Sequence, residues 1–169
     1  MDFSLSEEQK MIRQTVREFA EKELAVDARE RDAEERFPKQ QVKKMAELGF
    51  MGMMVDPKYN GGGLDTVSYC IMVEELSRVD ASAGVIASVN NSLVCAGIER
   101  FGTEAQKQQV LPPLAAGKKL GSFCLSEPST GSDASALQTT ATRDGDDWII
   151  KGTKNWITNG TQADTYLVF

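Results

Sequence analysis

Apolar residues recur at helical spacing along the first half of the chain, between stretches that carry capping and turn residues. After the capping-box sequence Ser6-Glu7-Glu8-Gln9, apolar positions repeat every three or four residues and charged side chains fill the positions between them. This pattern predicts a helix from about residue 7 to about residue 33. Pro38 is suited to open a second helix, and Gly49 to end it.

Three further helices are predicted between residues 65 and 117. The first covers residues 65–79, and the second, over residues 81–101, is apolar on every side, as is typical of a buried helix. The third starts at the capping box Thr103-Glu104-Ala105-Gln106 and is expected to stop or bend near Pro112-Pro113. Together these helices predict an antiparallel bundle.

A glycine-rich stretch, Asn60-Gly61-Gly62-Gly63, lies in the non-helical segment 50–64. Such a stretch invites comparison with phosphate-binding loops. It lacks the GxxxxGK[ST] pattern, and no GxGxxG follows a strand here. We therefore expect a structural turn.

After Lys119 the pattern changes to short, strand-like segments. A Thr-rich run before Asp144-Gly145 and an apolar run after it predict a hairpin. The expected strands cover residues 121–126, 137–142, 148–150, 153–158 and 165–169. The predicted fold is therefore a multi-domain α+β fold, with an all-α N-terminal helical bundle over residues 1–118 and the start of an antiparallel β domain over residues 119–169. Because a few strands leave open edges, we expect this β domain to be truncated and the chain to be a fragment of a longer one.

Composition and charge exclude several function classes. Hydrophobic residues make up 41% and charged residues 26%, and the formal net charge is −6, so nothing favours binding to nucleic acid or to an anionic membrane. No membrane span and no signal or transit peptide is expected, which predicts a cytoplasmic, bacterial-type protein. The chain has no histidine, which removes histidine acid/base catalysis and histidine metal ligands.

Several other residues have a structural and a functional interpretation. Cys70, Cys95 and Cys124 form no CxxC pair, so we expect buried small hydrophobes and no metal site. The charge run Arg29-Glu30-Arg31-Asp32 is expected to be a solvated helix face rather than a partner site. Asn90-Asn91-Ser92 interrupts the apolar helix, and its buried amides need partners from neighbouring helices or from a ligand.

Two polar clusters in the β part offer ligand chemistry. The first runs from Phe123 to Asp133, and its Gly131-Ser132 offers close backbone approach and a hydroxyl suited to a phosphate. The second is Asn155–Gly160, in which Trp156 and Thr158 would share one strand face suited to a planar heterocycle. From the residues alone, a hairpin sheet with a core tryptophan and a Gly/Ser turn is the alternative.

These clusters resemble the two flavin-contacting segments of the acyl-CoA dehydrogenases. The resemblance extends over the whole chain. It is carried by Leu125-Ser126-Glu127-Pro128 with Gly131-Ser132-Asp133, Trp156-Ile157-Thr158-Asn159-Gly160, Ser6–Gln9, Asp56-Pro57 with Gly61-Gly62, and Phe101-Gly102-Thr103 with Gln106-Lys107. Ser88–Leu93 is similar to the short-chain, butyryl-CoA-type branch.

The resemblance implies FAD bound non-covalently and α,β-dehydrogenation of a short-chain acyl-CoA thioester. A glutamate takes the α proton, the flavin takes the β hydride, and an electron-transferring flavoprotein reoxidises the flavin. The family's C-terminal helical bundle, with that glutamate, lies beyond residue 169, so no catalytic residue and no activity are expected of this chain alone. The full-length protein is expected to be a homotetramer. An acyl-CoA oxidase-type flavoprotein and a non-catalytic helical interaction module are the alternatives.

The resemblance also assigns residues. The flavin ring is expected to contact Phe123, Leu125, Ser126, Trp156, Ile157 and Thr158. Gly131 and Ser132 would lie by the pyrophosphate, and the substrate would meet Ser132, Asn90, Asn91 and Leu93. The chain departs from the family pattern with Ser129 for glycine and Ser126 for the common threonine, which keeps the hydroxyl. A structural role, not that of a base, is expected for Glu127.

Overall fold

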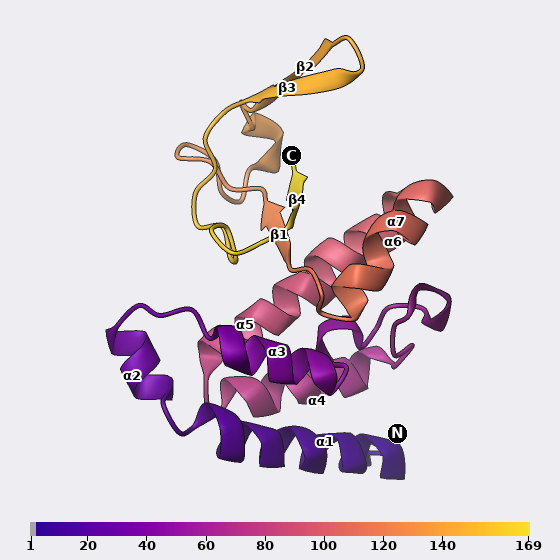
Figure 1. The fold of residues 1–169 in the computed structure, drawn as a ribbon, viewed down its shortest axis with the longest axis vertical. Coiled ribbons are helices and arrows are strands. Elements are labelled where there is room, and N and C mark those ends of the chain that lie inside the picture. Colours follow the sequence, from indigo (N-terminus) through magenta and orange to yellow (C-terminus); the bar gives the residue numbers. More distant parts are fainter. Residues whose placement is uncertain (1–2) are drawn as a thin grey trace.

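The computed structural model describes residues 3–169, which form a bundle of helices and a smaller part built of short strands (Figure 1). The helices are α1 (Glu7–Phe19), α2 (Ala28–Ala33), α3 (Lys39–Glu47), α4 (Thr66–Ser77), α5 (Ala81–Ser88), α6 (Ala96–Phe101) and α7 (Glu104–Ala115). The strands are β1 (Gly121–Cys124), β2 (Thr140–Asp144), β3 (Asp147–Lys151) and β4 (Thr165–Val168). A helical N-terminal part followed by a small β part is the predicted fold class. Met1 and Asp2, on which the expected absence of a signal peptide partly rests, lie outside the described residues.

The first predicted helix is broken. The capping box at Ser6 starts α1 as expected, and one wider π-helical turn, Ala20–Leu24, follows it. The chain then turns at residues 25–27 and restarts as α2, so the prediction of one helix to residue 33 is wrong. The break has a physical reason in Arg31, which is 3% exposed and donates to the Leu24 carbonyl that the helix end leaves free (3.3 Å).

Arg31 is held in a buried ion-pair cluster. Its guanidinium contacts the Asp27 carboxylate and lies 2.6 Å from Asp80 Oδ2. Asp80 in turn caps α5, because its Oδ1 accepts from the backbone N–H of Ala83 (3.1 Å). The expectation that the charge run 29–32 is wholly solvated is therefore wrong at Arg31, which fixes α2 to the start of the central helix.

The central helix is continuous over Ala81–Phe101 and contains a π-helical segment, Val89–Cys95, between α5 and α6. By length and composition it is apolar enough to cross a membrane, but half of its most apolar 18-residue window is buried inside the described structure. It packs here as the core helix of the bundle, and Gly97 on α6 lies so close to β4 that a Cβ there would meet Leu167 Cδ2 at 3.1 Å.

The hydrophobic core has two clusters, and residues at the start of the β part pack against both. The larger is built from α1, α3, α4 and α5, and Leu120 belongs to it. The smaller lies around the π-helical segment and α7, and the half-buried Phe123 packs against it. The start of β1 is therefore anchored between helices.

The glycine-rich stretch is a close-packed structural turn, as expected. A Cβ at Gly61 would come within 2.0 Å of the Val55 carbonyl oxygen, and the N–H of Gly62 donates to the Gly52 carbonyl (2.9 Å). The space for a phosphate is thus filled by the protein's own backbone.

The helix α7 runs through Pro112 and Pro113 and ends at Ala115, so of the two expectations, a stop or a bend near the prolines, the stop is wrong. The two hydrogen bonds that the prolines remove belong to the carbonyls of Gln108 and Gln109, four residues earlier. Both glutamines are exposed, so water can satisfy these carbonyls.

The strands form two separate pairs. β2 and β3 are the predicted antiparallel hairpin around the left-handed Gly145 (φ 62°), and this hairpin lies at the end of the molecule far from α1 (Figure 1). β1 and β4 pair in parallel, with Gly121 opposite Thr165 and Cys124 opposite Val168. The expected antiparallel arrangement is therefore wrong for this pair, and the predicted strand at residues 153–158 is a loop. Trp156 in this loop has a left-handed backbone (φ 59°), which a strand does not accommodate.

The three cysteines are free thiols with different surroundings. Cys95 and Cys124 are buried as predicted, and burial raises the pKa of Cys95 to about 12. Cys70 is exposed, contrary to the prediction. The buried side of α4 includes the polar residues Ser68 and Glu75 as well as apolar ones. The helix is therefore rotated relative to the orientation that would bury only its apolar residues, and Cys70 faces outward.

Replacing Arg31 tests the buried cluster. Arg31→Ala removes the arginine partner of Asp80 and leaves Asp27 with Arg36 (3.5 Å), and we expect the free energy of unfolding in urea to fall by about 3 kcal/mol. The control Arg29→Ala removes an exposed arginine of the same helix and should change stability by less than about 0.5 kcal/mol. Equal losses from both variants would contradict the structural role of Arg31.

Candidate functional site

The two polar clusters lie side by side. The backbone N–H of Asn155 donates to the Ser126 carbonyl (2.9 Å). The Ser122 hydroxyl donates to the Thr158 carbonyl (2.7 Å). The segment Phe123–Ser126 and the segment Trp156–Thr158 are thus tied together near both ends, which makes a common site for them geometrically possible.

An ion pair between Glu127 and Lys154 reinforces this contact. Lys154 Nζ donates to Glu127 Oε1 (2.8 Å) and to the Leu125 carbonyl (3.0 Å). Glu127 also accepts from the backbone N–H groups of Gln138 (2.7 Å) and Thr139 (2.9 Å). The hydrogen bond from Lys154 is the largest of the effects that lower the pKa of Glu127 from 4.5 to about 2. The carboxylate is charged and fully engaged, which is the structural role expected for it.

Trp156 is the most conspicuous side chain of the site, because it is 94% exposed. Its left-handed backbone turns the indole away from the interior, so the alternative of a core tryptophan is wrong. The shared strand face with Thr158 does not exist either, because residues 153–158 are a loop. Ile157 and Thr158 beside it are half-buried. The indole is therefore left uncovered by the described residues, one position after Asn155, whose backbone N–H is bonded to Ser126.

The first cluster ends in an open turn. Glu127 and Thr130 exchange backbone hydrogen bonds of 2.8 and 3.0 Å, and the exposed Gly131 and Ser132 follow. A Cβ at Gly131 would meet no atom within 4 Å. The backbone there is accessible to a ligand, which fits a phosphate-bearing group, just as the exposed indole fits a flat ring system.

The asparagines of the central helix are occupied by the protein. Asn90 Nδ2 donates to the carbonyls of Met51 (2.8 Å) and Leu114 (3.2 Å). Asn91 Nδ2 donates to those of Phe50 (2.8 Å) and Ala87 (2.9 Å), and both asparagines are at most 1% exposed. The helix itself and neighbouring segments thus accept from both side-chain NH₂ groups, whereas the buried Asn91 Oδ1 has no hydrogen-bond partner among the described residues. Contact of Asn90 and Asn91 with a substrate stays a prediction that these bonds do not support. Leu93, at 39% exposed, remains accessible.

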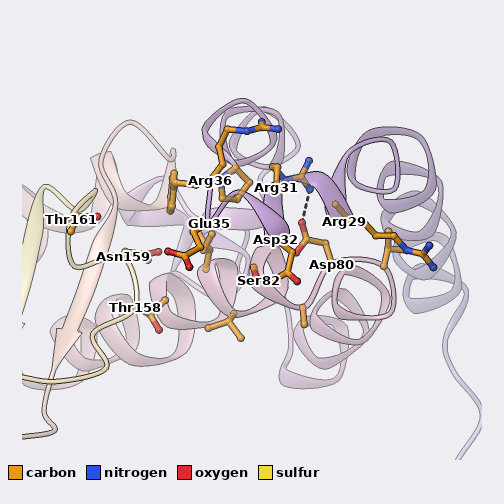
Figure 2. A pocket seen from close by; sticks show the side chains of 17 residues that line it. Arg29, Arg31, Asp32, Glu35, Arg36, Asp80, Ser82, Thr158, Asn159 and Thr161 are labelled. Atoms are coloured by element: carbon orange, nitrogen blue, oxygen red, sulfur yellow. Dashed lines mark hydrogen bonds and ion pairs between the residues drawn. The ribbon is translucent and has the colours of Figure 1, made fainter.

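A pocket of about 840 Å³ borders the second cluster. It lies between the segment that joins α2 to α3, the start of α5, and the loop Thr158–Thr161, as Figure 2 shows. Its charged lining is mixed, with Arg29, Arg36, Asp32 and Glu35 among the residues. In residues 3–169 no group of three acidic, cysteine or histidine side chains is placed to hold a metal ion.

The sequence analysis did not single out Lys154, and it included Asn159 in the second cluster without giving it a role, yet both residues shape the site. Lys154 joins both clusters, and Asn159 donates through Nδ2 to the Gly121 carbonyl (3.0 Å). Asn159 had a local signal, since an Asn-Gly pair is prone to a left-handed turn, and its φ is 65°. Lys154 had none, because its partners lie 27 and 29 residues away.

Comparison with known proteins gives consistent matches. Residues 6–118 match the acyl-CoA dehydrogenase N-terminal domain, and residues 122–169 match the acyl-CoA dehydrogenase middle domain. The mitochondrial short-chain specific acyl-CoA dehydrogenase of Bos taurus is 54% identical over 98% of this chain and 40% of its own length. The chain therefore spans less than half of this relative.

Two solved structures share the fold. Butyryl-CoA dehydrogenase from Megasphaera elsdenii is 41% identical with a TM-score of 0.92, covering 99% of this chain and 45% of that one. Glutaryl-CoA dehydrogenase from Mycobacterium smegmatis, in complex with FADH2, is 38% identical with a TM-score of 0.91, covering 97% and 42%.

The lowered pKa of Glu127 predicts a pH dependence of stability. A carboxylate whose folded pKa of about 2 lies below its ordinary 4.5 stabilises the fold above about pH 4.5, and this contribution is lost as the pH falls toward 2. Urea midpoints measured from pH 6 to pH 2 should therefore fall less steeply in Glu127→Gln than in the unmodified chain. The exposed Glu47→Gln serves as control. A Glu127→Gln curve parallel to that of the unmodified chain would refute the prediction.

Proposed function

Because the chain belongs to the acyl-CoA dehydrogenase family, we propose that the full-length protein dehydrogenates short-chain acyl-CoA thioesters, with FAD as its cofactor. The proposed substrate class, short-chain acyl-CoA, is supported by relatives that include a short-chain specific acyl-CoA dehydrogenase and a butyryl-CoA dehydrogenase. The flavin supplies the two-electron oxidant when it is bound. This chain's residues hold and orient it and contribute to the substrate site.

The observation that carries the proposal is the exposed indole of Trp156. Because Trp156 is 94% exposed, its apolar ring gains no stabilisation from burial. The left-handed backbone that holds the ring in this position costs about 1–2 kcal/mol in addition. Both costs are offset if a planar ligand covers the ring. Because the neighbouring Asn155 is bonded to Ser126, we propose that this ligand also contacts the first cluster, where the Ser126 hydroxyl would donate to its edge.

The turn at Gly131 and Ser132 fits the other end of such a cofactor. Its open backbone and the exposed hydroxyl can bond phosphate oxygens, and we assign Ser132 in addition to the CoA part of the substrate. Phe123, Ile157 and Thr158 are assigned to the flavin ring, and Leu93 to the substrate. These side chains bind and orient, and none of them moves a proton.

The base of the reaction is proposed to lie outside this chain. Glu127 is unsuited to the role, because four hydrogen bonds and a pKa of about 2 leave it neither free nor basic at neutral pH. We therefore expect residues 1–169 alone to be inactive. The proposal also includes an electron-transferring flavoprotein as electron acceptor, a homotetrameric full-length protein and a cytoplasmic location.

Two substitutions at tryptophan test the cofactor site in the full-length protein. Trp156→Ala should weaken FAD binding at least about tenfold, because the stacking surface is lost. Trp148→Ala, the control, removes the only other tryptophan, which lies on the β2–β3 hairpin, and should change the Kd less than about twofold. The Kd is measured by titrating apoprotein and following flavin fluorescence.

The activity has its own readout. The full-length protein should show a flavin absorbance band that bleaches on addition of butyryl-CoA, and residues 1–169 should not bleach. A colourless full-length protein that cannot be reconstituted with FAD would refute the proposed function. Rapid oxygen consumption without an electron-transferring flavoprotein would instead indicate an oxidase.

A further inference from the structure

Both backbone polar groups of one residue, Gly121, are bonded to buried asparagine side chains. Its N–H donates to Asn90 Oδ1 (2.9 Å), and its carbonyl accepts from Asn159 Nδ2 (3.0 Å). Asn90 is 0% and Asn159 8% exposed, so water does not compete for either bond. Two residues that are 69 positions apart in the chain thus meet at the first residue of β1.

These bonds lie along the edge of β1 that faces away from β4. The carbonyls of Leu120 and Cys124 accept from the β4 side, from Thr165 and Phe169, so the alternating pattern of a strand directs the peptide groups of Gly121 to the opposite edge. No described strand pairs with β1 along that edge. Side chains occupy it instead, with Asn90 and Asn159 at Gly121 and Lys154 at Leu125.

The two asparagines connect different parts of the molecule. Asn90 is bonded through Nδ2 to Met51 and Leu114, so it fixes Gly121 to the helical core. Asn159 belongs to the loop that carries Trp156, so its bond fixes this loop to the same glycine. The fit is close, because a Cβ at Gly121 would come within 2.7 Å of Val94 Cγ1.

We propose that Asn90 and Asn159 are positioning residues of the flavin site. Resting on the proposed function, this inference assigns them no contact with flavin. They act through Gly121. Its bond to Asn90 fixes the position of the segment Phe123–Ser126 relative to the helical core, and its bond to Asn159 fixes the position of the Trp156 loop relative to that segment. The Ser122–Thr158 bond and the Asn155–Ser126 bond then carry this placement along both segments.

Asn159→Gly in the full-length protein tests one side of the arrangement. Glycine keeps the left-handed backbone without strain and removes only the amide, leaving the buried Gly121 carbonyl without its donor. We expect the Kd for FAD to rise about tenfold and the flavin absorbance band of the saturated protein to shift. The matched control is Asn60→Gly, which alters the other left-handed asparagine (φ 69°), an exposed one remote from the site, and should change neither quantity.

Asn90→Ala tests the other side, with Asn91→Ala as control. Both variants remove a buried amide of the same helix that bonds two carbonyls, but only Asn90 contacts Gly121. Both should therefore lower the unfolding midpoint, and only Asn90→Ala should also speed hydrogen exchange in the peptide covering residues 118–126 and weaken FAD binding. Measurements are made at a temperature where each variant is fully folded.

The outcomes separate the two proposals. If the unmodified protein binds no flavin, the proposed function fails, while the exchange experiment still tests the bonds at Gly121. If it binds flavin but Asn159→Gly and Asn90→Ala leave the Kd and the absorbance band unchanged, the positioning role is refuted alone. Equal effects of Asn90→Ala and Asn91→Ala on flavin would also refute it, because general destabilisation would then explain both.

Discussion

The first strand begins inside the helical core, so its peptide groups must find hydrogen-bond partners where water is absent. An unpaired buried peptide group costs about 1–3 kcal/mol, and β4 can satisfy only one edge of β1. The other edge depends on Asn90, Asn159 and Lys154. The placement of the Trp156 loop and of the central helix around β1 follows from this constraint, because the three side chains that bond this edge belong to these two segments.

Buried charges follow the same rule. Arg31 enters the core only with Asp80 and Asp27 beside it, and Glu75 of α4 is 2% exposed against the Arg17 guanidinium, which donates to both carboxylate oxygens (2.9 and 2.7 Å). Hydrogen bonding by Arg17 is the largest effect on Glu75 and keeps its pKa below the ordinary value. Two of these pairs join elements distant in sequence, since Arg17–Glu75 joins α1 to α4 and Arg31–Asp80 joins α2 to the start of α5.

Features set by neighbouring residues were predictable from the sequence, and features set by distant partners were not. The capping boxes at Ser6 and Thr103 and the turn at Gly145 depend on side chains within a few positions, and each is present. The inward turn of Arg31 depends on Asp80, 49 residues away. The site divides in the same way, because its two segments were recognisable as motifs, whereas the loop conformation that exposes Trp156 depends on contacts with β1.

The π-helical segment Val89–Cys95 closes its backbone hydrogen bonds over five residues instead of four, so it holds one residue more than α-helical geometry would in the same place. A deletion of one residue there would let the segment relax to α-helical geometry, and α5 and α6 would keep nearly the same rotational phase. Gly97 would then stay against Leu167 of β4. The cost of such a deletion would fall on side chains inside the segment, because the amides of Asn90 and Asn91 would leave their present carbonyl partners. At this point the fold therefore constrains the positions of particular side chains more strictly than the length of the chain.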